Sequence, residues 1–229
     1  MPTGTQQITQ TPIDDEQKNI AESVIEIKTR LERVSAFRLN SAAKSTQNFA
    51  NRPHRFIQIG YQRHNLIFIP GVSSERREYI PMGFLDKDTV VVAPNFAIYN
   101  HKTWIFGVIS SKMHMVWVRA VAGRLETRIR YSSTLCYNTF PFPNISEEQK
   151  KLLEFHVFNV LDERERHSEK TLAELYDPDK MPAGLREAHH NLDIAIEQCY
   201  RLKPFESDEE RLEYLFALYE QMTAQENKK

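Results

Sequence analysis

Six cations and one acid in the middle of the chain are suited to binding a polyanion. Arg76 and Arg77 are adjacent in a stretch expected to form an exposed turn, and the other members are Lys112, Arg124, Glu126, Arg128 and Arg130. DNA binding requires cations at the phosphates and, for sequence specificity, planar or bidentate groups at the base edges. The residue types and their clustering therefore indicate a DNA-binding surface.

Glu126 is the informative member of this set. An acid among arginines near DNA is unfavourable unless it accepts a hydrogen bond from a cytosine amino group or holds a neighbouring arginine in position. Because Glu126 and Arg128 are two residues apart on an expected strand, their side chains would point the same way and could read the two halves of one C·G pair. The alternative is a surface ion pair worth about 0–1 kcal/mol. The residue pattern alone favours that alternative.

The sequence offers no convincing active site. It lacks the Gly-rich FxGxG loop that binds S-adenosylmethionine, the [DN]PP[YF] tetrapeptide of amino-methyltransferases and a GxSxG elbow. A PD-(D/E)xK nuclease site could be assembled from Asp14 or Asp15 with Glu26 and Lys28, but these residues fall in a helical pattern rather than on a strand. His114 lies between two methionines in an apolar stretch, which is typical of a core histidine. We therefore expect binding rather than catalysis from this chain.

Charge is distributed unevenly along the 229 residues. The formal net charge is only −1. Residues 51–143 nevertheless carry twelve Lys/Arg and five Asp/Glu, whereas residues 144–229 carry twelve and twenty. A polyanion responds to local charge, so the middle of the chain is the expected contact region and the acidic C-terminal part is not. The middle also holds 14 of the 24 aromatic residues, which is consistent with nucleic-acid binding as well as with a sheet core.

Hydrophobic periodicity predicts helices at both ends and strands between them. A polar lead over residues 1–12 precedes an amphipathic helix with apolar residues from Ile20 to Val34, and a second helix is expected within 37–50. Residues 56–59 and 66–70 read as an antiparallel strand pair, and 89–93 as a buried strand. Residues 105–122 are apolar all round and predict one buried helix, followed by a strand over 125–136 that would present Glu126, Arg128 and Arg130 on one face.

Four capped helices are expected after residue 145. Ser146 and Ser207 begin capping-box sequences, Ser168 is a candidate cap for a short helix, and Pro182 fits the first turn of the next. The expected fold class is therefore α+β, with a polar lead and helical connector at 1–50, a mixed sheet-and-helix domain at 51–145 and a helical bundle at 146–229. Cys136 and Cys199 form no metal-ligand or CxxC spacing, and no apolar run is long enough to cross a membrane, so a cytoplasmic setting without membrane contact is expected.

Several long phrases resemble one known family. They are SSERREYIPMGF at residues 73–84, SSKMHMVWVRAVAGRLETRIRYS at 110–132, YNTFPFP at 137–143 and the segment LYDPDKMPAGLREAHHNLDIAIEQCYRLKPFESDEERLEYLFALYEQM at 175–222. Together they are similar to the target-recognition domain and C-terminal helical region of MmeI-like type IIL restriction-modification enzymes. Those enzymes join a PD-(D/E)xK nuclease, a helical connector and an adenine-N6 methyltransferase to these two regions in one polypeptide.

The resemblance implies a sequence-specific double-stranded DNA recognition module that is not catalytic by itself. In that family the glutamate and arginine of the E-x-R element after the GRL phrase take part in base recognition, and they match Glu126 and Arg128 here. S-adenosylmethionine and Mg²⁺ are expected only in the methyltransferase and nuclease domains, which would be the protein partners of this chain. Two alternatives are a specificity subunit that completes a methyltransferase in trans and a helical protein-interaction module.

Overall fold

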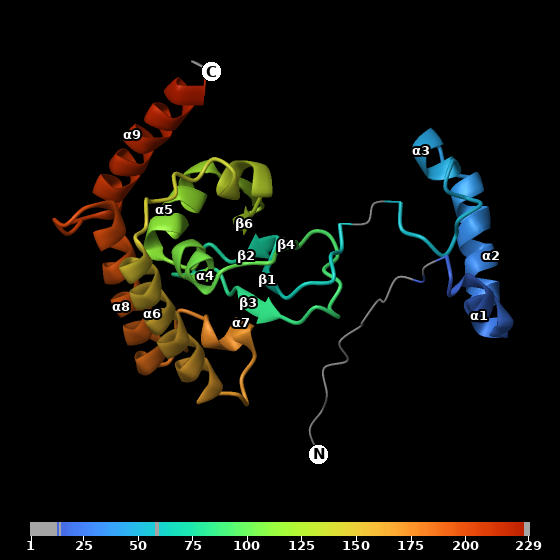
Figure 1. Ribbon diagram of the computed structural model, residues 1–229, viewed down its shortest axis with the longest axis horizontal. Helices are drawn as coiled ribbons and strands as arrows, with labels where there is room; N and C mark the ends of the chain where they lie inside the picture. The colour runs from blue at the N-terminus through green and yellow to red at the C-terminus, as the bar shows by residue number, and fades with distance from the viewer. Residues whose placement is uncertain (1–12, 14, 58–59, 227–229) are drawn as a thin grey trace. The chain divides into compact units, whose positions relative to one another are not determined.

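The described residues form two compact units. The computed structural model describes residues 13, 15–57 and 60–226 (Figure 1). The smaller unit contains the described residues up to Arg63 together with Lys87–Val90, and the larger contains the described residues of His64–Asp86 and Val91–Lys229. The expected polar lead at 1–12 and Asp14 lie outside the described residues. None of the helices in the described part of the chain has both the length and the apolarity that a membrane crossing requires.

The smaller unit is helical, as the periodicity predicts. It contains α1 (Lys18–Ser23), α2 (Ile25–Leu39) and α3 (Lys44–Gln47), and the break between the first two lies at Val24, whose backbone is extended. The Arg38 guanidinium donates hydrogen bonds of 2.7–3.0 Å to the carbonyl oxygens of Phe49, Arg52 and Arg55. These bonds hold the chain after α3 against α2.

The strand predictions before residue 100 are only partly right. Leu66–Ile69 is a strand (β1), but it pairs antiparallel with β3 (Gly83–Leu85) and β4 (Phe96–Tyr99). The expected partner strand is wrong at 56–57, which are irregular, and its residues 58–59 lie outside the described residues. The predicted buried strand at 89–93 is also wrong, because the segment is irregular and only partly covered. Its β-branched residues have strand propensity, but the strand that pairs with β1 is β4, which follows this segment in the chain.

A second small sheet contains β2 (Val72–Ser73), β6 (Arg128–Arg130) and β5 (Gly123–Leu125), in the order β2-β6-β5. All of its pairings are antiparallel. The predicted single strand over 125–136 is wrong, since the chain reverses at Glu126 and Thr127 and forms a π-helical turn, η1, at Ser133–Tyr137. The segment is therefore a hairpin followed by a helical turn.

The predicted buried helix over 105–122 is two helices. They are α4 (Thr103–Ile109) and α5 (Lys112–Val121), and the helical structure is interrupted between them at Ser110 and Ser111. The Ser111 hydroxyl accepts a hydrogen bond from the backbone N–H of His114, so it caps α5, and Ser110 donates to the Phe106 carbonyl. His114 is buried beside the Tyr131 hydroxyl at 3.0 Å, and burial lowers its pKa to about 3. Its prediction as a core histidine is confirmed.

Most of the helix caps predicted after residue 145 are present in the structure. The helices are α6 (Glu147–Glu165), α7 (Leu172–Leu175), α8 (Ala183–Tyr200) and α9 (Asp208–Glu226). Ser146 and Gln149 form the expected capping box, and Pro182 directly precedes α8. Thr171, rather than Ser168, caps α7. The Ser207 hydroxyl accepts from the N–H of Glu210, whose carboxylate accepts from the N–H of Glu206.

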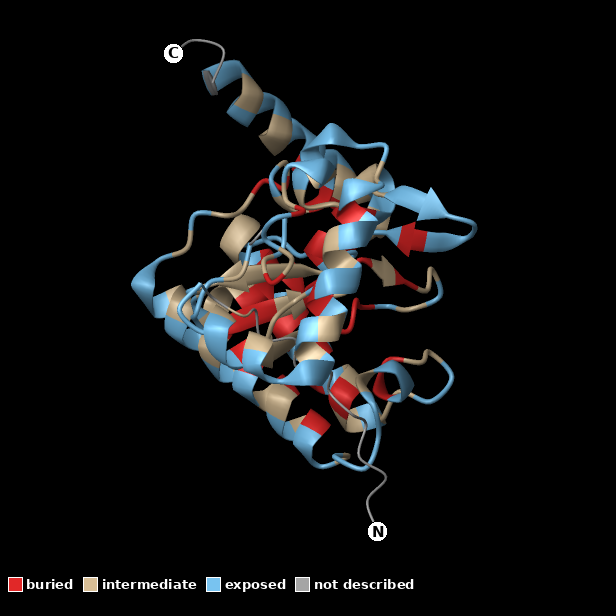
Figure 2. Cartoon of the chain, turned by 90° about the vertical axis from the view of Figure 1, so that its right-hand side faces the viewer, coloured by how far each residue is buried: buried red, intermediate tan, exposed pale blue. Residues whose placement is uncertain are grey.

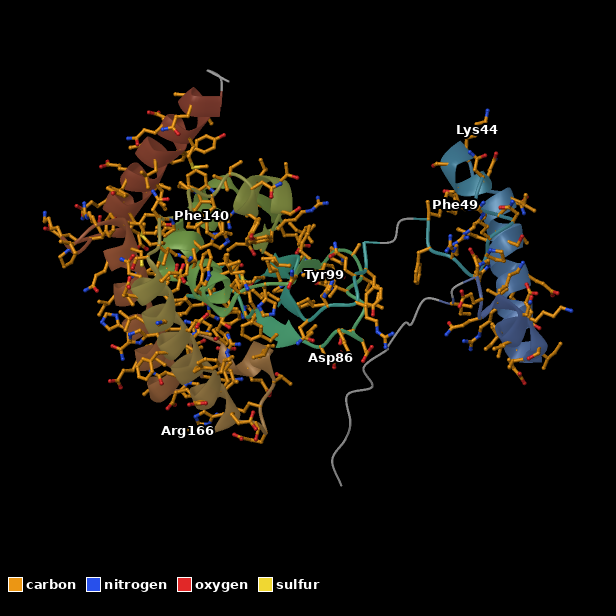
Figure 3. The ribbon with its side chains drawn as sticks, in the orientation of Figure 1. Lys44, Phe49, Asp86, Tyr99, Phe140 and Arg166 are labelled. Atoms are coloured by element: carbon orange, nitrogen blue, oxygen red, sulfur yellow. The ribbon has the colours of Figure 1, made fainter. Side chains whose placement is uncertain are left out.

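One hydrophobic core runs through the whole larger unit. Helix α6 packs against α4 and α8, and α9 packs against α5, so α4 and α5 lie between the C-terminal helices and the strands (Figure 1). Trp117 on α5 contacts Phe216 and Tyr219 of α9, and Phe140 packs edge-on against Trp117 and His114. Figure 3 labels Phe140 among the side chains of the larger unit. The predicted α+β class is confirmed, and the C-terminal helices share one core with α4, α5 and the strands.

Candidate nucleic-acid interface

The β5–β6 hairpin presents arginines to solvent over a single buried anchor. Ile129 is fully buried, whereas its neighbours Arg128 and Arg130 are exposed, and all three residues of β5 are exposed. In the cartoon coloured by burial the hairpin is exposed over most of its length (Figure 2). The two-residue alternation predicted for Arg128 and Arg130 is therefore present. The buried Ile129 side chain therefore anchors the strand that carries Arg128 and Arg130.

Glu126 lies in the turn of this hairpin rather than on a strand face. Its φ is +57°, in the left-handed region. Its carboxylate accepts a hydrogen bond of 2.8 Å from the Arg128 guanidinium, and both side chains are substantially exposed. The strand face predicted to carry Glu126, Arg128 and Arg130 together is therefore wrong for Glu126, although the ion pair that the pattern favours is present. Acid and arginine remain adjacent at the hairpin tip.

The positive φ strains the backbone at Glu126, and glycine at this position would relieve that strain. We expect Glu126→Gly to leave the free energy of unfolding unchanged or to raise it by up to about 1 kcal/mol, because the left-handed backbone costs a non-glycine residue about 1–2 kcal/mol. Thr127→Gly is the matched control, since Thr127 has no positive φ and glycine there should lower stability. Urea unfolding of both variants measures this, and equal destabilisation would contradict it.

The loop after β2 brings two more arginines to the same region. Ser73 of β2 pairs with Ile129 of β6, so the chain leaves the sheet towards the end that carries Arg128. Arg76 is exposed and donates to the Asp179 carboxylate at 2.7 Å, which raises the pKa of Arg76. Arg77 is half-buried and donates to the Ala173 carbonyl at 3.2 Å. Hydrogen bonds to Ala173 and Asp179, in and after α7, thus hold this loop in place.

Arg119 is a member of the surface that the sequence patterns do not single out. It lies in the last turn of α5 and donates to the Arg77 carbonyl at 3.0 Å, while its own carbonyl accepts from the Arg124 guanidinium at 3.2 Å. The available signal was its spacing of seven residues from Lys112, which places both on one side of α5. The structure therefore brings together Arg77, Arg119 and Arg124. Because Arg124 is paired with Ile129, its side chain lies on the Ile129 face of the hairpin, and Arg128 and Arg130 lie on the opposite face.

Lys112 lies apart from this group, whereas Arg130 shares a strand face with Arg128 and borders a cavity. Lys112 is at the first turn of α5, about 10 Å along the axis from Arg119, and its ammonium is 3.6 Å from the Asp208 carboxylate. Arg130 lines a separate surface cavity of about 530 Å³ together with Gly71, Pro94 and Leu135. Among the described residues its guanidinium has no hydrogen bond or ion pair, so it is available to a ligand.

The described residues include no group of three or more His, Cys, Asp or Glu side chains that could hold a metal ion. A buried carboxyl group with a raised pKa lies on another element, at Asp193 of α8. This carboxyl group is buried, and burial raises its pKa to about 7, although hydrogen bonds from Tyr79 and from the backbone N–H of Lys112 oppose the shift. Its contacts connect α8 to the start of α5 and to Tyr79, two residues after Arg77.

Comparisons with known proteins agree over nearly the whole chain. Residues 11–144 match the family described as "MmeI, target recognition domain", and residues 145–226 match "MmeI, C-terminal domain". "DNA methyltransferase A" of Bacillus subtilis (strain 168) is 45% identical over 197 residues, which are 86% of this chain and 22% of that protein. The type IIL restriction-modification enzyme MmeI, solved in complex with DNA, is 37% identical with a TM-score of 0.89, over 93% of this chain and 28% of that one.

Proposed function

The chain belongs to the MmeI family, in which it combines the target recognition domain with the C-terminal domain, and we propose that it reads a short sequence in double-stranded DNA. The observation that carries this proposal is the acid–arginine pair at the tip of an exposed hairpin, bordered by further arginines. A cationic surface supplies affinity for phosphates, whereas paired acceptor and donor groups supply base selectivity.

The reading step follows from the chemistry of the pair. Glu126 can accept a hydrogen bond from the N4 amino group of cytosine, and Arg128 can donate to O6 and N7 of guanine. In the free protein these groups satisfy one another at 2.8 Å. Because the pair is exposed, separating it costs only about 0–1 kcal/mol, so exchanging it for two base edges is feasible. Arg76, Arg77, Arg124 and Arg130 would contact phosphates and fix the register of the hairpin on the duplex.

We assign methylation and cleavage to parts of a longer polypeptide. The chain spans 22% and 28% of the lengths of the two proteins that it matches. On this proposal S-adenosylmethionine and Mg²⁺ belong to methyltransferase and nuclease domains, which are the protein partners of this recognition module, in the cytoplasm. The reading surface itself needs no cofactor for hydrogen bonding to bases.

Selection from a randomised duplex library, followed by titration at several salt concentrations, tests the function. We expect one enriched DNA word, and a slope of log affinity against log salt of roughly −3 to −4, because each of about four neutralised phosphates contributes about −0.9. Competition with duplexes of unrelated sequence is the control. Failure to bind any duplex would contradict DNA recognition and favour the protein-interaction module.

A further inference from the structure

Arg119 connects the two segments that carry the proposed DNA contacts. Its guanidinium donates to the carbonyl of Arg77, in the loop after β2, and its carbonyl accepts from the guanidinium of Arg124, on β5. We propose that Arg119 is a positioning residue, which sets the distance between this loop and the β5–β6 hairpin so that both engage one DNA site. This inference rests on the proposed function and adds a specificity-determining residue to it.

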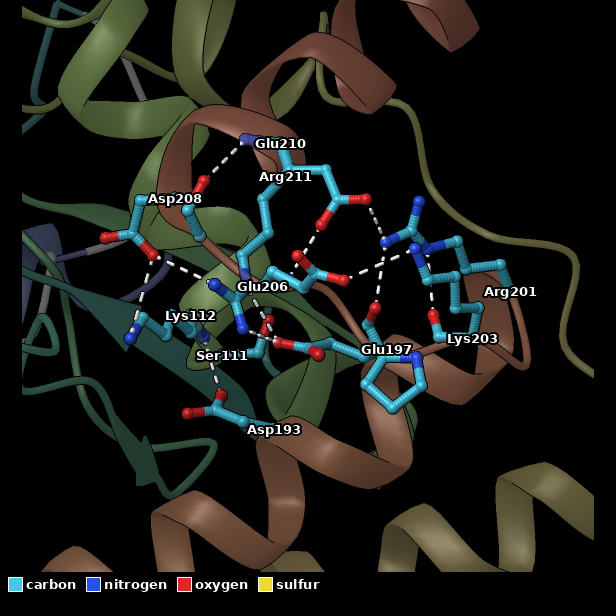
Figure 4. Close-up of polar contacts among 12 residues, drawn as sticks. Ser111, Lys112, Asp193, Glu197, Arg201, Lys203, Glu206, Asp208, Glu210 and Arg211 are labelled. Carbon is cyan, nitrogen blue, oxygen red and sulfur yellow. Dashed lines mark hydrogen bonds and ion pairs between the residues drawn. The ribbon is translucent and has the colours of Figure 1, made fainter.

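Helix α5 is a fixed platform for Arg119. Its residues from Met113 to Val118 are all buried, so the helix cannot shift without disturbing the core. Its first turn is fastened to the C-terminal helices, since the backbone N–H of Lys112 donates to Asp193 at 2.7 Å and the Lys112 ammonium lies 3.6 Å from Asp208 (Figure 4). Asp208 also accepts from Arg211, which pairs with the largely buried Glu197. The backbone of Arg119, in the last turn of α5, is therefore held in a fixed position.

Neither of the segments that Arg119 connects is held by extensive burial. Residues 74–77 are exposed or half-buried, and β5 is exposed throughout. The hairpin depends on Ile129 for its apolar anchor, and the loop on bonds from Arg76 and Arg77 to the region of α7. Backbone pairing of Ser73 with Ile129 joins the two segments within the sheet, and the two hydrogen bonds at Arg119 add a second link beyond the sheet. Register in β5–β6 places Leu125 opposite Arg128, so a displacement of β5 would also displace the reading pair.

The effect of Arg119 variants on base preference shows whether this residue positions the hairpin or only contacts a phosphate. The full 229-residue chain, carrying Arg119→Ala, Arg119→Lys or no change, is titrated against the selected duplex, against versions with one base pair replaced, and against duplex of unrelated sequence. Lys151→Ala is the matched control, because it removes one exposed cation from α6, away from the hairpin. Thermal melting of each variant checks that it is folded.

We expect Arg119→Ala to reduce the ratio of affinities for selected and altered duplexes by roughly tenfold, the effect of losing one charged hydrogen bond. Binding to unrelated duplex and the salt slope should stay as in the unchanged chain. Arg119→Lys should recover part of the ratio, because an ammonium can donate to the same carbonyl, and Lys151→Ala should leave the ratio unaltered.

Two results would overturn the assignment. Equal weakening on every duplex by Arg119→Ala, with a salt slope smaller by about 0.9, would make Arg119 a phosphate contact. An unchanged ratio in a folded Arg119→Ala variant would remove the positioning role while leaving the proposed function intact. If the unchanged chain itself prefers no duplex, the proposed function fails first, and the role of Arg119 fails with it.

Discussion

A chain that carries Glu126→Lys together with Arg128→Asp is expected to prefer a different base pair at one position of its site, with most of its affinity for DNA retained. The exchange reverses donor and acceptor at the hairpin tip while it keeps the sum of their charges. A lysine donates where the glutamate accepted, and an aspartate accepts where the arginine donated. Bidentate or paired base contacts contribute about 1–3 kcal/mol of discrimination, so the preference should change by roughly 5-fold to 150-fold.

Library selection on the double variant and on the unchanged chain measures this result directly. The two enriched words should differ at one position only, since the cations that contact phosphates are untouched. Arg128→Ala is the control that removes a donor without offering a new acceptor, and it should weaken the original preference without creating another. If the double variant selects the original word, or loses affinity equally for all words, the pair does not read bases.

How far the sequence predicted this surface depends on how local each signal is. The capping box at Ser146 is a local signal and was predicted correctly. Pro182 also marks the start of a helix, but it is the N-cap of α8 and not in the first turn, where it was expected. The helical character of the smaller unit was also predicted, because it follows from the spacing of nearby residues. The clustering of cations in the middle of the chain was visible for the same reason.

The secondary-structure predictions are wrong where tertiary contacts determine the local conformation. Alternation of charged and apolar residues predicted one strand through 125–136, but the turn at Glu126 has no glycine to mark it, and only the pairing of β5 with β6 fixes it. The apolar stretch that predicted one helix is divided by two serines that satisfy backbone groups locally. Arg119 was not singled out, because its partners are backbone carbonyl and guanidinium groups of segments that a linear pattern does not bring together.

Asp193→Asn is expected to make the protein more stable at alkaline pH relative to the unchanged chain. The pKa of Asp193 is raised from 3.8 to about 7, chiefly by burial, so the folded protein binds one more proton than the unfolded chain between these values. The stability that this protonation provides is present at low pH and is lost as the pH rises through 7. Between pH 5 and pH 8 the loss from this group alone is about 2–3 kcal/mol.

Asparagine avoids that loss because it does not ionise and can keep both contacts. Its side-chain oxygen can accept from the N–H of Lys112, and its amide can donate to the Tyr79 hydroxyl, in place of the bonds of 2.7 Å that the carboxylate forms. Urea unfolding at pH 5 and pH 8 measures the difference in free energy between the two proteins, which should shift in favour of the variant at pH 8. Asp179→Asn, at an exposed carboxylate that pairs with Arg76, is the control and should show no such gain. A difference that is the same at both pH values would mean that Asp193 ionises in the folded protein as readily as it does in water, and that the start of α5 is held by a solvated carboxylate.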